Sequence, residues 1–441
     1  MTNRSNAMHR CVLQCAGLVL FLSATTVTAA GPLAGQSILT LEEVHALLRD
    51  RNPRLKAARA MTEATGARES MAGLLPDPTF QFGAMNLAMP GFSASMPNSM
   101  VPSVRAMLMV PFPGKLGLNG RIAGQSTSMA EAGASEVWWE VRSQAAMAFY
   151  EIWQADRQIE VMRKTLGLLH DFEQVARAMY ASGTGRQSDV LRANVEVARM
   201  DAEIVRMQAM RGGAAARLNA LIDRPAEAVL SDPQLGALPL AVPDADTLRA
   251  WAALSRPMLE RSRIGVEQAE TRRTLAHREI WPDFTVGIEY GQRPMDDGTA
   301  RMASAMIGFS LPIFAGRRQL RMRDEAAAME QMARAELSEV QADVGARVGE
   351  LLADLGRTRE LVRLYRTEIL PQADANVQSA FSSYRVGAVD FMTLVDAEML
   401  ANRFEGELYG LLADYGRSIA DLQMTIGREL PVTGETMAEA S

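Results

Sequence analysis

The stretch YRVGAVDFMTLVDAE, residues 384–398, interrupts a region whose other residues are typical of a long helix. MTLVDAE continues as helix, whereas VGAVD in front of it does not. The stretch YASGTGRQSDVLRAN, residues 180–194, has the same skeleton. In both stretches a tyrosine is followed after two residues by a glycine. After six further residues come two aliphatic residues, one residue of any type and an alanine. The shared break indicates that one structural plan occurs twice in the chain.

Further matches extend the repeat over most of the chain at an offset of about 204 residues. PRLKAAR from Pro53 matches PMLERSR from Pro257. LPDPTFQFG from Leu75 matches WPDFTVGIEYG from Trp281, and VPFPGK matches LPIFAGR at the ends of the following segments. The matches keep their order and nearly constant spacing, so we interpret them as a duplication.

The duplication predicts the organisation of the chain. We expect a signal peptide at 1–29, repeat one at 30–222, a linker rich in proline and small residues at 223–244, repeat two at 245–430 and a tail at 431–441. Each repeat should contain a helix (41–74 and 245–280), a β-hairpin (about 78–112 and about 283–312) and then long helices on both sides of the break.

The first 29 residues have the pattern of a secretory signal peptide. Basic residues precede an apolar run, and Val27 and Ala29 predict cleavage after Ala29. The alternative is a retained membrane anchor. Cys11 and Cys15 both lie in this segment, so the mature chain would have neither a disulfide nor a thiolate metal site. Neither cysteine follows a lipidation-like tripeptide, so we do not expect an N-terminal lipid.

Composition favours long helices. Aromatic residues make up only 6% of the 441, whereas alanine, methionine, arginine, glutamate and leucine are abundant. No proline occurs between Pro113 and Pro225. A helix over residues 122–181 would be on the order of 90 Å long, a length that coiled-coil-like packing accommodates. The alternative is several shorter helices that break at internal glycines.

The hairpin segments alternate between apolar and polar residues. In FTVGIEYGQR, residues 284–293, the aromatic and branched side chains share one face, and threonine, glycine and glutamate share the other. A half-buried soluble sheet gives this pattern, and so does a membrane barrel that is apolar outside and polar inside. Four strands cannot close a barrel, but three copies would give a closed barrel of twelve.

The duplicated plan, the segment 370–398 and the Pro…Gly-[Lys/Arg] exit from each hairpin resemble the TolC family of outer-membrane efflux ducts. The resemblance implies a mainly α fold with a β-barrel part. Such a homotrimer has a 12-stranded barrel in the lipid of the Gram-negative outer membrane, continued by a 12-helix periplasmic α-barrel. It further implies two partners, a periplasmic adaptor (membrane fusion) protein and an inner-membrane RND-type pump.

The resemblance also implies roles for the two breaks. They would be the hairpin turns at the periplasmic tip, where Gly183 and Gly387 mark the adaptor-docking surface. In the family's gate, a tyrosine of the second turn bonds an aspartate after the first, which corresponds here to Tyr384 and Asp189 with Ser188 beside it. Asp396 corresponds to one aspartate of the family's narrowest ring.

Two positions depart from the family's gate. Val389 stands where the relatives have an arginine, and Thr393 stands where they have a second aspartate. One of the two contacts that hold the family's gate closed is therefore missing, and the narrowest ring of the trimer would hold three carboxylates rather than six. Such a ring should hold cations less tightly.

Methionines crowd both hairpins. By the strand alternation, a subset faces the lumen and forms our predicted metal site: Met85, Met107, Met109, Met302 and Met306. Thioethers suit Cu(I) and Ag(I), which points to the metal-exporting, CusC-like and CzcC-like branch of the family. The alternatives are that methionine is filler and that the cargo is an organic drug or solvent.

We expect neither an enzyme nor a cofactor. Only His45, His170 and His277 would remain after processing, and no triad or phosphate-loop spacing occurs. The net charge of −6 gives no indication of nucleic-acid binding. A soluble periplasmic coiled-coil scaffold is the alternative from another class, but it does not explain the alternating strands.

Overall fold

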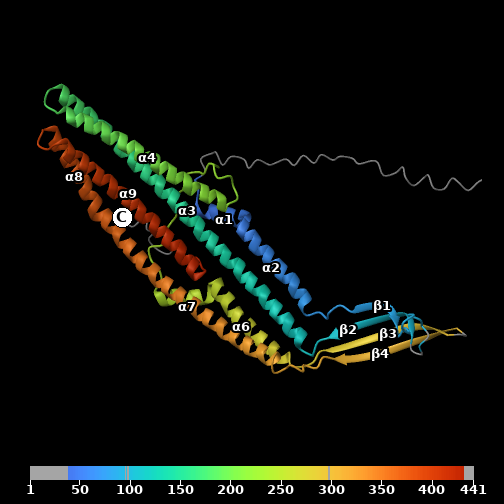
Figure 1. The fold of residues 1–441 in the computed structure, drawn as a ribbon. Helices are drawn as coiled ribbons and strands as arrows, with labels where there is room; N and C mark the ends of the chain where they lie inside the picture. Colours follow the sequence, from blue (N-terminus) through green and yellow to red (C-terminus); the bar gives the residue numbers. More distant parts are fainter. Residues whose placement is uncertain (1–37, 95, 97–98, 296–297, 432–441) are drawn as a thin grey trace, which may run out of the picture.

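The computed structural model describes residues 38–94, 96, 99–295 and 298–431. The predicted signal peptide and tail residues 432–441 lie outside the described residues. The chain is elongated, with the strands at one end and two helical hairpin turns at the other (Figure 1).

The helices are α1 (Leu41–Arg51), α2 (Pro53–Ala72), α3 (Lys115–Ala181), α4 (Gln187–Leu221), α5 (Ala245–Ser255), α6 (Pro257–Arg278), α7 (Gln319–Leu364), α8 (Leu370–Arg385) and α9 (Phe391–Ile426), with a π-helix at Tyr365–Ile369 between α7 and α8. The strands are β1 (Thr79–Met85), β2 (Met100–Val110), β3 (Phe284–Met295) and β4 (Gly298–Phe309). Within the described part of the chain, none of the helices has the length and apolar character that crossing a bilayer requires.

The first predicted helix of each repeat is in fact two helices. Asn52 ends α1 and caps α2, where its side chain accepts a hydrogen bond from the Leu55 amide at 3.0 Å. Pro53 and Pro257 explain both breaks, because proline lacks the amide that a helix interior needs and disfavours helical backbone in the residue before it. A proline at the first position instead starts the second helix.

The predicted long helix of repeat one is confirmed. α3 runs for 67 residues without a break and would be on the order of 100 Å long. The glycines inside it do not divide it. α3 packs along both α4 and α9, so it joins the helices of the two repeats side by side. The main core lies along this contact and includes the fully buried Phe149, Ile152 and Leu422.

The four strands form one antiparallel sheet in the order β1-β2-β3-β4. β2 and β3 pair across the two repeats, with Ala106 opposite Ile288. The predicted alternation leaves one face apolar and uncovered, as shown by Phe82 at 77%, Ile288 at 64% and Ile307 at 78% exposure. The predicted fold class, long helices in two repeats with a small sheet at one end, is confirmed.

Lys115 joins the sheet to the helices. Its side chain is 4% exposed, and its Nζ lies 2.9 Å from Asp283 Oδ1 and 3.3 Å from Glu279 Oε2. Asp283 Oδ1 also accepts a hydrogen bond from the Phe112 amide at 2.8 Å. Phe112 stacks on Trp281 with ring centroids 5.3 Å apart. This Lys115 joint therefore links the exit of the first hairpin to the entry of the second.

A pair of helix glycines should respond in opposite ways to the same substitution. A Cβ on Gly416 in α9 would lie 2.5 Å from the ring of buried Tyr150, so Gly416→Ala should lower the free energy of unfolding by about 1–3 kcal/mol. A Cβ on Gly356 in α7 would meet nothing within 4 Å, so Gly356→Ala should raise it by about 0.5–1 kcal/mol. Thermal unfolding checks both, and shifts of equal sign would contradict the packing.

Candidate functional site

Two methionines converge over a glycine on the polar face of the sheet. Gly287 of β3 lies between Met107 of β2 and Met306 of β4. A Cβ on Gly287 would lie 2.8 Å from Met306 Cγ and 3.3 Å from Met107 Cγ. Both methionine side chains therefore occupy the space that the missing side chain leaves, and we call them the Gly287 pair.

A second methionine group lies around Gly291, four residues further along β3. Gly291 is opposite Met302 of β4, and a Cβ on it would lie 2.7 Å from Met100 Sδ. Met100 and Met302 are the Gly291 pair. The sequence did not predict Met100 for this face, because strict alternation places it on the apolar side. The strand pairing shifts register between Gly83 and Met85 on the neighbouring strand, and strict alternation does not predict such a shift.

A buried charge pair lies between the two methionine pairs. Glu289 is between Gly287 and Gly291 on the same face of β3, and its side chain is 4% exposed. Its Oε2 lies 3.1 Å from an Arg105 Nη, whereas its Oε1 has no hydrogen-bond partner among the described residues. The same Arg105 nitrogen lies 3.1 Å from Met85 Sδ.

The structure thus brings together four of the five predicted methionines. Met107 and Met306 form one pair, Met302 belongs to the other, and Met85 contacts the arginine between them. Met109 is opposite Thr285 at the helix end of the sheet and is 49% exposed. Among the described residues, no group of three or more histidines, cysteines, aspartates and glutamates could hold a metal.

The two tip turns share one backbone geometry. Gly183 and Gly387 have φ of 78° and 73°, in the left-handed region that favours glycine. Their amides donate to the carbonyls of Tyr180 at 3.0 Å and Tyr384 at 2.9 Å. This Tyr-x-x-Gly geometry explains why both helices end at the skeleton seen in the sequence.

The hydrogen bond implied between Tyr384 and Asp189 is absent. The Tyr384 hydroxyl has no hydrogen-bond partner among the described residues, although the ring is only 3% exposed. Burial raises the pKa of Tyr384, and the nearby Asp189 carboxylate raises it further. The ring packs edge-on against Phe391 at 5.5 Å, so packing holds it in place. Ser188 Oγ lies 3.4 Å from Asp189 Oδ1, as an immediate neighbour.

Local structure accounts for both departures from the family's gate. Asp390 caps α9 and accepts hydrogen bonds from the Thr393 amide at 2.9 Å and hydroxyl at 2.6 Å. These bonds lower the pKa of Asp390. Thr393 is therefore a capping partner, and Val389 packs against the apolar cluster at the tip, which includes Phe391 and Leu394.

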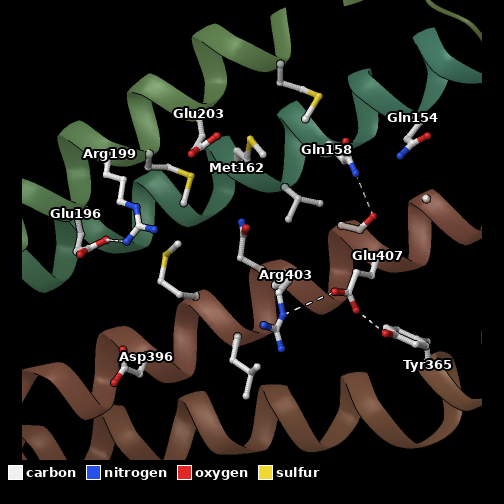
Figure 2. A pocket seen from close by; sticks show the side chains of 18 of the residues that line it. Gln154, Gln158, Met162, Glu196, Arg199, Glu203, Tyr365, Asp396, Arg403 and Glu407 are labelled. Carbon is white, nitrogen blue, oxygen red and sulfur yellow. Dashed lines mark hydrogen bonds and ion pairs between the residues drawn. The ribbon is translucent and has the colours of Figure 1, made fainter. Parts of the chain in front are cut away.

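Asp396 lies in a groove of about 980 Å³ between α3, α4 and α9 (Figure 2). Arg199 pairs with Glu196 at 3.7 Å, and Arg403 lies 3.7 Å from Glu407. No ion pair or hydrogen bond is found for the Asp396 side chain among the described residues. Asp189 and Tyr384 are not among the residues that line this groove.

Comparison with known proteins identifies this arrangement. Residues 249–428 match the profile of the family described as outer membrane efflux protein. The second repeat belongs to this outer membrane efflux protein family. The predicted resemblance to the TolC family and the outer-membrane location are thereby confirmed. No match was found among curated proteins.

Solved outer-membrane channels share the fold of this chain over nearly its whole length. VceC from Vibrio cholerae is 17% identical with a TM-score of 0.76, covering 88% of this chain and 96% of its own. CusC is 14% identical with a TM-score of 0.74, covering 88% and 92%. The open state of MtrE from Neisseria gonorrhoeae is 17% identical with a TM-score of 0.71, covering 90% and 91%. At these identities the likeness establishes the fold.

Proposed function

We propose that this efflux protein is the exit duct of a tripartite system and forms a homotrimer in the outer membrane. The uncovered apolar face of the sheet carries the proposal, because the described residues of one chain provide no partner for those side chains or for the outer edges of β1 and β4. Three copies would close twelve strands and turn the apolar face to lipid. The duct conducts passively and catalyses no reaction.

The partners follow from the two ends of the molecule. The turns at Gly183 and Gly387 lie together at the end opposite the sheet, which would be deep in the periplasm (Figure 1). A periplasmic adaptor would dock on these turns and connect the duct to an inner-membrane RND-type pump. The energy for transport then comes from the pump, since the duct has none of the nucleotide or catalytic motifs sought in the sequence.

The periplasmic gate is proposed at Asp189, Ser188 and Tyr384 in the tip, followed by Asp396 in the groove above it. Proximity of Asp189 to Tyr384 supports the first part, and the unpaired Asp396 carboxylate supports the second. In this gate, packing of the Tyr384 ring against Phe391 replaces the hydroxyl latch.

The proposed cargo is a heavy-metal cation such as Cu(I) or Ag(I). The polar face of the sheet presents methionine thioethers, which are soft ligands for these ions. An organic drug or solvent is the competing cargo, and methionine as filler is the competing explanation.

Deletion of the gene tests the duct and its cargo together. We expect tolerance of copper and silver to fall and a plasmid copy to restore it, because metal that the pump delivers would have no exit. Zinc and a panel of drugs are measured beside them. Lost drug tolerance with unchanged copper and silver tolerance would contradict the metal cargo, and no change in any of them would contradict the duct.

A further inference from the structure

The polar face of the sheet carries a defined arrangement beyond a general supply of thioethers. Two glycines on β3, Gly287 and Gly291, each leave a gap in the row of side chains, and methionines from the neighbouring strands fill both gaps. Glu289 lies between the gaps on the same face, about 7 Å from each glycine along the strand. Soft sulfur and one carboxylate therefore lie in neighbouring rows on the same face of the sheet.

Glu289 is incompletely satisfied where it lies. Its side chain is 4% exposed, Arg105 bonds only one of its oxygens, and Oε1 has no hydrogen-bond partner among the described residues. A buried carboxylate oxygen without a partner carries a desolvation cost that a cation would offset. Because Arg105 already balances the charge of Glu289, a monovalent cation would leave the site with a single net positive charge.

We propose that Met107, Met306 and the free oxygen of Glu289 form a binding site for a soft monovalent cation, Cu(I) or Ag(I). Thioethers select such ions over hard cations, which prefer oxygen ligands throughout. The Gly291 pair, Met100 and Met302, lies two rows further along the same face of the sheet and would form a second thioether site. This inference rests on the proposed duct and identifies where inside it the cargo would be held.

The glycines are part of the site. A Cβ on Gly287 would lie 3.2 Å from Met306 Sδ and 2.8 Å from its Cγ, so any larger residue would push the thioether out of the row. Gly287→Ala should therefore weaken binding of silver, although it removes no ligand.

Methionine oxidation measured residue by residue in the purified wild-type trimer is the direct test. Ag(I) is the probe, since it does not change oxidation state under these conditions, and a coordinated sulfur resists peroxide. With silver at about ten times its dissociation constant, oxidation of Met107 and Met306 should slow about tenfold. Met61 and Met71, exposed thioethers of α2, serve as internal controls and should oxidise at unchanged rates. Equal rates with and without silver at all four positions would overturn the proposal.

A variant series separates this site from the proposed cargo. Glu289→Gln keeps the shape of the side chain and removes its charge, so silver affinity should fall about tenfold. Met107→Leu with Met306→Leu should abolish protection, whereas Met61→Leu with Met71→Leu should not. If the double variant does not assemble, either single leucine variant must still weaken binding. If silver binds the purified protein but the deletion strain keeps normal metal tolerance, the proposed cargo is refuted and the binding site stands. If the deletion strain loses metal tolerance but silver protects neither Met107 nor Met306 from oxidation, only the binding site is refuted.

Discussion

Replacing Phe391 with alanine should loosen the periplasmic tip more than any other single change there. Phe391 is 1% exposed and lies at the centre of the tip cluster, edge-on to Tyr384 and beside the fully buried Leu394. Truncating a buried phenylalanine costs about 3–5 kcal/mol, because the cavity closes only in part. Amide hydrogen exchange in the last turn of α8 and the first turn of α9 should accelerate, and the proposed trimeric duct should stay open for longer in planar bilayers.

Tyr384→Phe is the matched control for this prediction. It removes a buried hydroxyl that has no hydrogen-bond partner and keeps the ring against Phe391, so both exchange and conductance should remain as in wild type. If Tyr384→Phe opened the duct and Phe391→Ala did not, a hydroxyl latch would hold the tip, and the packing gate would be wrong.

Lys115→Ala should weaken the junction between sheet and helices. The substitution removes a buried cation from Asp283 and Glu279, whose side chains are 31% and 34% exposed. Breaking a buried ion pair typically costs about 3–5 kcal/mol, and partial exposure of both carboxylates lowers our expectation to about 2–3 kcal/mol. The midpoint of thermal unfolding and the yield of trimer from membranes should both fall.

Lys56→Ala provides the comparison for the Lys115 joint. Lys56 is exposed on α2 and forms no ion pair among the described residues, so its loss should change the free energy of unfolding by less than about 0.5 kcal/mol. Equal stability of the two variants would show that the joint contributes little to the fold.

Sequence patterns predicted the features that depend on local periodicity. The Tyr-x-x-Gly skeleton predicted the helix break at both turns. Each turn needs a residue with left-handed backbone geometry, and glycine adopts this geometry most readily. Alternation predicted the strands and the shared face of Met107 and Met306, since strand side chains repeat every two residues. The long proline-free segment predicted α3.

Features that depend on packing or on a local insertion were missed. The sequence shows Pro371, but it did not predict the π-helix at Tyr365–Ile369 just before this proline. One wider helical turn there lets the helix continue past the proline. Met100 was missed because a register shift breaks strict alternation. The unbonded Tyr384 hydroxyl could not be predicted either, since a shared motif carries over a residue type but not its side-chain contacts.

The two tip turns also differ in one respect that bears on the history of the chain. Tyr180 and Tyr384 occupy equivalent places in the duplicated skeleton, yet the first is 48% exposed and the second 3%. After a duplication, the two copies of a residue come under different selection. Substitutions at Tyr180 do not disturb the core of the tip. Tyr180 can therefore change together with a partner that contacts the outer surface of the tip. Tyr384 lacks this freedom, so the first hairpin should diverge among descendants faster than the second.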